Sequence, residues 1–207
     1  MRCWSLLLAV MPFVAHAQTC GPTLAFISDT QAPLWIETLW QRPDHNTEAT
    51  ASLFADLCKR PASDVFVTGD VVNMGPAVGH WSTMDSLLAR TRGSGKRVHA
   101  LLGNHELMRN ARKGERNFQQ RFPDHTNTGY TVVVDSVAVI MLNSNFKKMT
   151  KGQRAEQRAW YLRSLTALDT AAAVRSIIVC CHHSPYSDSR IVGSNTVVQE
   201  EFVRPFL

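Results

Sequence analysis

Apolar and polar residues follow two different periods along the chain of 207 residues. Short unbroken apolar runs are typical of buried strands, and stretches with an apolar residue every three or four positions are typical of amphipathic helices. The short runs predict strands over residues 23–28, 64–68, 97–102, 130–134, 137–142 and 176–181. The longer stretches predict helices over residues 48–59, 78–92, 153–168 and 196–207. Strands that alternate with helices in this way predict a layered α/β fold.

Four polar side chains come just after predicted strands. They are Asp29, Asp70, Asn104 and His183. Ligands of open α/β sheets bind in the crevice at the carboxyl ends of the strands. We therefore expect these four side chains to lie close together at one edge of the sheet.

The first 17 residues differ from the rest of the chain. Arg2 precedes an apolar run over residues 4–14, and Ala15-His16-Ala17 follows it. This order predicts a secretory signal peptide that is cleaved after Ala17, so that the mature domain covers residues 18–207 and lies in the periplasm or outside the cell. The run is shorter than the roughly 20 residues that span a bilayer, so we expect no membrane span after cleavage. A buried N-terminal strand is the alternative interpretation.

Composition places the rest of the chain among globular domains. Hydrophobic residues make up 44% and charged residues 19% of the sequence, which disfavours disorder. Export permits disulfides, and Cys20 with Cys58 is the pairing that we prefer. The 22 Lys and Arg residues exceed the 17 Asp and Glu residues, with small basic clusters over 109–116 and 147–158. We interpret these clusters as solvated helix faces rather than as a nucleic-acid patch, because no stripe of aromatic and basic residues accompanies them.

The residues after the predicted strands suit a metal centre. Carboxylate and amide oxygens together with imidazole nitrogens bind divalent ions such as Mn²⁺, Fe²⁺ or Zn²⁺. A single carboxylate such as Asp70 can bridge two ions about 3.5–4 Å apart, as hydrolases with two metal ions require. A plainer interpretation is that Asp29 and Asp70 are helix caps or turn residues, and that Asn104 occupies a turn.

Three segments carry a family resemblance. GDVVNMG begins at Gly69, GNHE begins at Gly103, and HHSPYS begins at His182. In this order they resemble the middle motifs of the calcineurin-like metallophosphoesterase superfamily, and the resemblance extends from about Leu24 to the last residue. The resemblance implies a layered α/β/α sandwich with a mixed sheet and a site for two divalent metal ions.

The same resemblance assigns the metal ligands. It implies that Asp29 and Gln31 hold the first ion and that Asp70 bridges both ions. It implies that Asn104 and His183 hold the second ion. His183 is preferred over its neighbour because the family's ligand precedes a small residue and a proline.

The remaining polar residues of the motifs receive other roles. By the resemblance, His105 contacts the phosphate and protonates the leaving group. Asn73 either caps its loop or lines the phosphate pocket, and we favour the pocket. We interpret His182 as a packed histidine rather than a ligand.

Two departures from the family pattern weaken the expected metal site. Gln31 stands where the family has histidine, and its neutral amide oxygen is a weaker donor to transition metals than imidazole. The family's final Gly-His-x-His motif does not occur before Leu207. In the family it follows a helix like the one predicted over 196–207 and one further strand, so we expect a domain that is incomplete at its C-terminus.

The predicted function is hydrolysis of the phosphate ester of a small molecule, either a monoester or a diester, at a site with two metal ions. The alternative, favoured by Gln31 and the absent motif, is a catalytically inactive or incomplete binding protein of the same fold. A nuclease-type phosphodiesterase ranks third. Specificity in such folds is set by loops, here residues 32–47 and 147–152, and neither has a recognisable motif.

Overall fold

The computed structural model describes residues 23–34, 45–189 and 192–207. The predicted signal peptide, Cys20 and most of the 32–47 loop lie outside this range. Cys58 forms no disulfide with a described cysteine, and its Sγ lies 3.9 Å from the hydroxyl of Thr91. Among the described residues, no helix combines the length and the apolar character that crossing a bilayer requires.

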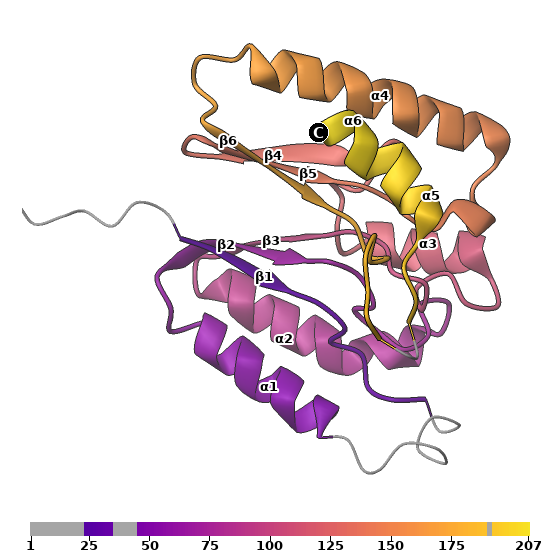
Figure 1. Cartoon of the computed structure of the whole chain (residues 1–207). Helices are drawn as coiled ribbons and strands as arrows, with labels where there is room; N and C mark the ends of the chain where they lie inside the picture. Colours follow the sequence, from indigo (N-terminus) through magenta and orange to yellow (C-terminus); the bar gives the residue numbers. More distant parts are fainter. Residues whose placement is uncertain (1–22, 35–44, 190–191) are drawn as a thin grey trace, which may run out of the picture.

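The first sheet is parallel and has the strand order β1-β2-β3. Its strands are β1 (Thr23–Ile27), β2 (Ala62–Val67) and β3 (Arg97–Ala100). Its crossover helices are α1 (Asn46–Leu57) and α2 (Ser82–Gly93), the second of which follows the short helix η2 (Val78–Trp81). Both helices lie on the same outer face of the sheet (Figure 1). A parallel pair needs such a crossover, and consecutive crossovers bring the carboxyl ends of all three strands to one edge.

The second sheet is mixed and has the order β4-β5-β6. Its strands are β4 (Tyr130–Val134), β5 (Val137–Met141) and β6 (Ser176–Cys180). The strands β4 and β5 form an antiparallel hairpin, and β6 pairs in parallel with β5 after the short helix η3 and the long helix α4. These helices are η3 (Phe146–Lys148) and α4 (Lys151–Asp169). The chain ends in one helical segment made of α5 (Thr196–Val198), η4 (Gln199–Val203) and α6 (Arg204–Phe206).

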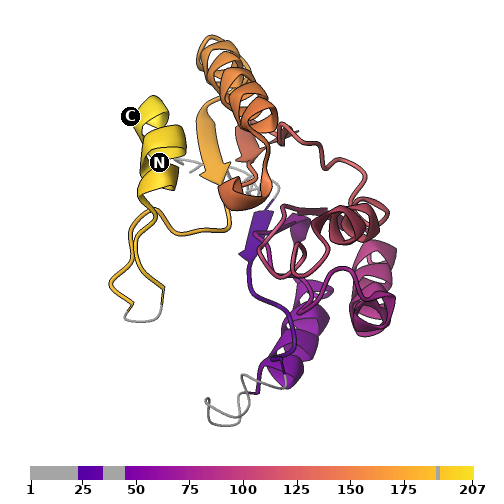
Figure 2. The same ribbon diagram turned by 90° about the vertical axis from the view of Figure 1, so that its right-hand side faces the viewer.

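The two sheets face each other, with helices on both outer faces, so the layers run α/β/β/α (Figures 1 and 2). Phe66, Leu101 and Met141 belong to the core between the sheets. Ile140, the neighbour of Met141 in β5, instead packs in the core with Tyr161 of α4. Because β5 is buried on both faces, its sequence is a continuous apolar run. The predicted layered α/β fold is confirmed, with the strands divided between two sheets rather than joined in one.

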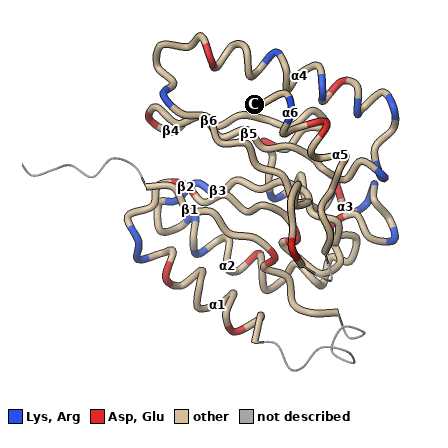
Figure 3. The backbone as a smooth tube through the Cα atoms, viewed as in Figure 1, with Lys and Arg blue, Asp and Glu red and all other residues tan. Residues whose placement is uncertain are grey.

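One helix has no counterpart in the predicted elements. The helix α3 (Ala111–Gln119) begins at Asn110, whose side-chain oxygen accepts the N–H of Lys113. It buries Phe118 and carries the basic cluster of residues 109–116 mainly on its exposed side. Figure 3 shows Lys and Arg residues spread over several helices rather than in one stripe.

Candidate metal centre

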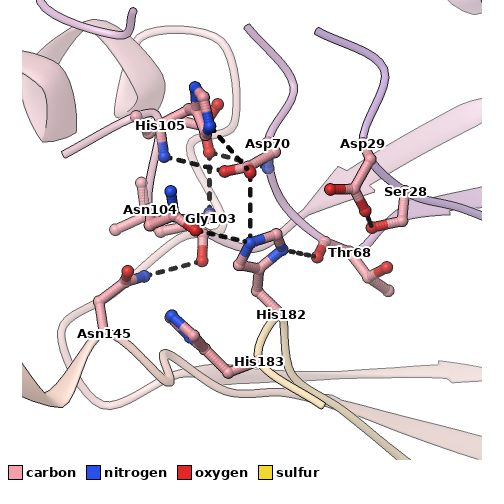
Figure 4. A network of polar contacts seen from close by, with 12 residues as sticks. Ser28, Asp29, Thr68, Asp70, Gly103, Asn104, His105, Asn145, His182 and His183 are labelled. Carbon is pink, nitrogen blue, oxygen red and sulfur yellow. Dashed lines mark hydrogen bonds and ion pairs between the residues drawn. The ribbon is translucent and has the colours of Figure 1, made fainter. Parts of the chain in front are cut away.

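The loops that follow β1 and β2 run side by side at the carboxyl edge of the first sheet. The N–H of Asp29 donates to the carbonyl of Gly69 at 3.2 Å, and the N–H of Gln31 donates to the carbonyl of Asp70 at 3.1 Å. Asp29 and Asp70 both have left-handed backbones, with φ of 54° and 50°. Such conformations cost energy for a residue other than glycine and cluster at functional sites. The two carboxylates therefore leave the sheet in similar, strained turns (Figure 4).

Two glycines make room for this arrangement. Gly69 has φ of 101°, and a Cβ built there would lie 2.6 Å from Nδ1 of His182. A Cβ on Gly103 would overlap the carboxylate of Asp70. Any side chain at either position would push the polar groups apart.

Asp70 lies at the centre of the site and is buried. Its Oδ1 accepts the backbone N–H of His105 at 2.9 Å, and its Oδ2 lies 3.3 Å from Nε2 of His182. Burial alone would raise the pKa of Asp70, but the hydrogen bond and charge of His182, together with the groups of His105, outweigh burial and hold this pKa below its ordinary value. The side chain is therefore a carboxylate at neutral pH.

Asp29, Asp70 and His182 form a cluster with the spacing of a metal site. Each offers one ligand atom, and these atoms lie within 4.8 Å of one another. Nδ1 of His182 donates to the carbonyl of Thr68 at 3.1 Å, so its Nε2 faces Oδ2 of Asp70 and, at 3.2 Å, Oδ1 of Asn104. Burial lowers the pKa of His182, but Asp70 more than compensates and raises it above its ordinary value. Oxygen acceptors thus converge on a point that requires positive charge, which a divalent cation would supply.

The backbone of Gln31 lies beside this cluster, because its N–H donates to the carbonyl of Asp70. Its Oε1 is buried and has no hydrogen-bond partner among the described residues. A buried amide oxygen without a partner is costly unless a ligand satisfies it. Hard oxygen donors with one imidazole are a fitting set for a divalent cation, so the residues of this edge fit a bound metal.

The two adjacent histidines face different surroundings. The sequence favoured His183 as a ligand, whereas the structure brings His182 into the cluster with Asp29 and Asp70. Nδ1 of His183 lies 2.8 Å from the hydroxyl of Ser144. Burial, the charge of His182 and that of Lys147 lower the pKa of His183 below its ordinary value. His183 therefore lies beside the cluster as a neutral imidazole (Figure 4).

The alternation of side chains along β6 explains this placement. Cys180 faces the core between the sheets, and Cys181 faces the core beneath α4. Successive residues of an extended chain point to opposite faces, so His182 points toward the first sheet and His183 points away. The alternation chooses between the two histidines only once the face of each cysteine is known, and the sequence alone does not give that.

Glu106 holds the loops in place and received no role in the sequence motifs. Its Oε2 accepts the N–H groups of Asp70 at 3.0 Å and Gly103 at 2.8 Å, and its Oε1 accepts that of Val72 at 3.0 Å. The side chain is fully buried, and burial together with the charge of Asp70 raises its pKa to about 7. One carboxyl group therefore joins the loop after β2 to the loop after β3.

His105 and Asn73 lie on the other side of Asp70. Nδ1 of His105 donates to the carbonyl of Asn73 at 3.1 Å, which leaves its Nε2 3.7 Å from Oδ2 of Asp70. The Oδ1 atom of Asn73 contacts the ring of His80, and both residues line a cavity of about 350 Å³ with Thr30. Asn73 thus lines a pocket next to the metal ligands, while its backbone orients His105.

Comparisons with known proteins concern the family and the fold of the chain. The sequence model of the family described as calcineurin-like phosphoesterase matches residues 22–206. None of the curated proteins matches the chain significantly. A crystal structure of a dimetal phosphatase from Danio rerio aligns with 88% of this chain and 76% of its own chain, with 15% identity and a TM-score of 0.54. At that identity the likeness concerns the fold, and the family match covers most of the sequence. The chain belongs to the calcineurin-like phosphoesterase family.

Proposed function

We propose that this protein hydrolyses phosphate esters of small molecules, monoesters or diesters, with two divalent metal ions. The observation that carries the proposal is the cluster of Asp29, Asp70 and His182, whose ligand atoms lie within 4.8 Å of one another. His105 lies directly beside this cluster, with its Nε2 3.7 Å from Oδ2 of Asp70. A carboxylate pair, an imidazole ligand and a second imidazole for proton transfer are the groups that metal-assisted ester hydrolysis requires.

The donor set divides between two ions. Asp29 and the side-chain oxygen of Gln31, which has no partner among the described residues, would hold one ion, and Asp70 would bridge. Asn104 and His182 would hold the second ion, since Oδ1 of Asn104 already lies 3.2 Å from Nε2 of His182. When bound, Mn²⁺, Fe²⁺ or Zn²⁺ would supply Lewis acidity that neutralises phosphoryl oxygens and activates water.

His105 supplies the proton that the leaving oxygen needs. Nδ1 of His105 donates a hydrogen bond to the carbonyl of Asn73 at 3.1 Å. Nε2 is therefore the atom that can give a proton to the leaving oxygen. The ring is mostly buried and cannot turn without losing this hydrogen bond. A general acid in such a fixed position contributes about 10²–10⁴-fold in rate.

The proposal is tested by metal content and hydrolysis together. The protein is freed of metal with a chelator and reloaded with Mn²⁺, Fe²⁺ or Zn²⁺. Bound metal is then measured, along with hydrolysis of nitrophenyl phosphate and bis(nitrophenyl) phosphate. We expect about two ions per chain and hydrolysis of at least one ester. Folded protein that binds two ions and hydrolyses neither ester would reject the proposed activity.

A binding protein without activity is the second candidate. It is favoured by Gln31, which replaces an imidazole donor with a neutral amide oxygen. It predicts a correctly folded chain that takes up little metal in the same experiment. Substitution of Gln31→His distinguishes the two candidates. A hydrolase whose only weak metal donor is Gln31 should gain metal affinity and hydrolysis together. An inactive binding protein should gain no hydrolysis.

A further inference from the structure

Asn104 and His183 line a groove of about 260 Å³ together with two lysines, Lys147 and Lys148. We call it the lysine groove. We propose that the lysine groove binds a second anionic group of the substrate, a phosphate or a carboxylate, while the ester to be cleaved lies at the metal centre. This inference rests on the proposed function, and it names a substrate class that the metal centre alone does not select.

The lysine groove is continuous with the metal centre. Asn104 lies 3.2 Å from His182 on one side and lines the groove on the other. His183 is the neighbour of His182, and their ring centroids are 5.2 Å apart. Figure 4 shows Asn104, Asn145 and His183 together beside His182. A substrate whose phosphate reaches the metal centre can therefore extend into the groove.

The lysines occupy a fixed position relative to this edge. They belong to η3, which follows the buried Asn145. The side chain of Asn145 donates to the carbonyl of Leu102 at 3.0 Å, two residues before Asn104. The ring of Phe146 lies between the guanidinium of Arg154, at 4.9 Å, and the ring of Phe202, at 5.3 Å. Because the first residue of η3 and the residue before it are both held by these contacts, little conformational entropy is lost when a ligand orders the backbone that carries the lysines.

The charge of the lysine groove is not neutralised by the protein. None of the described residues that line it is acidic. Neither Lys147 nor Lys148 forms an ion pair with a described residue, whereas nearby Arg154 and Arg158 both pair with Glu201. Two lysines in the lining of one groove, without an ion-pair partner among the described residues, are suited to an anion.

The test compares three substrates that differ only at the far end of a three-carbon chain. Propanediol monophosphate ends in a hydroxyl, phosphooxypropanoate in a carboxylate, and propanediol bisphosphate in a second phosphate. We expect the metal-loaded protein to have a lower KM for the bisphosphate than for the monophosphate. In the double variant K147Q/K148Q this advantage should shrink about fivefold, since exposed charge pairs contribute modestly. A lower KM for the carboxylate substrate as well shows that either anion is accepted. A lower KM for the bisphosphate alone shows that phosphate is required.

The matched control is K59Q/K113Q, which removes two charges from exposed lysines outside the groove. It should keep the wild-type KM ratio, so a ratio that changes equally in both double variants would overturn the inference. So would an unchanged ratio in K147Q/K148Q. Calorimetric binding of propane monophosphonate and propane bisphosphonate gives a readout without hydrolysis. If no ester is hydrolysed, the proposed function fails, and the ratio of these two affinities still decides whether the groove binds the second anion.

Discussion

The first sheet supplies the metal centre from three successive loops, whereas the second sheet supplies only the residues that follow β6 (Figures 1 and 4). On the first sheet, central strand β2 has four consecutive buried residues before its loop, and the buried carboxyl of Glu106 ties two loops together. On the second, β6 pairs with β5 alone among the described strands, and its residues 177–179 are only partly buried.

This difference separates the anionic half of the site from its imidazole half. The carboxylates are fixed by backbone hydrogen bonds within one sheet, so their positions follow from local structure. His182 and His183 reach the site across the interface between the sheets, so their positions depend on how the sheets pack. We expect changes in the first half to abolish metal binding and changes in the second to weaken it.

The largest effect is expected for Asp70→Asn. It keeps the shape of the side chain and removes the charge that faces both His105 and His182. Metal content and hydrolysis should fall together, the rate by about 10³-fold or more, because the bridging carboxylate is lost. Atomic absorption and an ester assay measure the two losses. The exposed Asp188→Asn is the matched control and should retain both, and a D70N protein with full metal content would contradict bridging.

His105→Ala should reduce turnover without reducing metal content. It removes an imidazole that belongs to the first sheet and that we assign to proton transfer. Turnover should fall by about 10²–10⁴-fold while the metal content stays at the wild-type level. The defect should be smaller for esters with acidic leaving groups such as nitrophenol, which need less protonation. Equal losses for all leaving groups would argue against a general acid.

The pair His182→Ala and His183→Ala sharpens the contribution of the second sheet. His182 lies in the metal cluster, and His183 contacts Ser144 instead. We expect H182A to weaken metal affinity about 10²-fold, and H183A to weaken it by less, as the loss of a neighbouring group does. Titration with a metal-binding dye measures both. The opposite ranking would make His183 the ligand, as the family motif implies.

The sequence predicted the site residues of the first sheet better than those of the second. Asp29, Asp70 and Asn104 were predicted to meet because the carboxyl ends of parallel strands share an edge, and the structure places them there. The choice between His182 and His183 needed the orientation of β6 between two cores, which no local pattern contains. The helix α3 was missed because its nine residues carry one large apolar residue, Phe118. With a single large apolar residue the segment has no recurring apolar spacing, so its sequence resembles that of a polar loop.

Substitution of Glu106 tests how the loops of the first sheet are held in place, without changing a candidate ligand. Its two oxygens accept three backbone N–H groups from the loops after β2 and β3. In Glu106→Gln the amide nitrogen replaces one oxygen, so at least one buried N–H loses its acceptor and faces another donor. We expect a loss of about 1–3 kcal/mol in the free energy of unfolding, measured by urea denaturation. The exposed Glu48→Gln, in the first turn of α1, serves as the control and should change stability little.

If the loops are held mainly by Glu106, metal affinity should fall as well, because the carboxylate of Asp70 follows the backbone that Glu106 fixes. Unchanged stability in E106Q would show instead that the strand pairing of the first sheet holds the carboxylates in place without this carboxyl group.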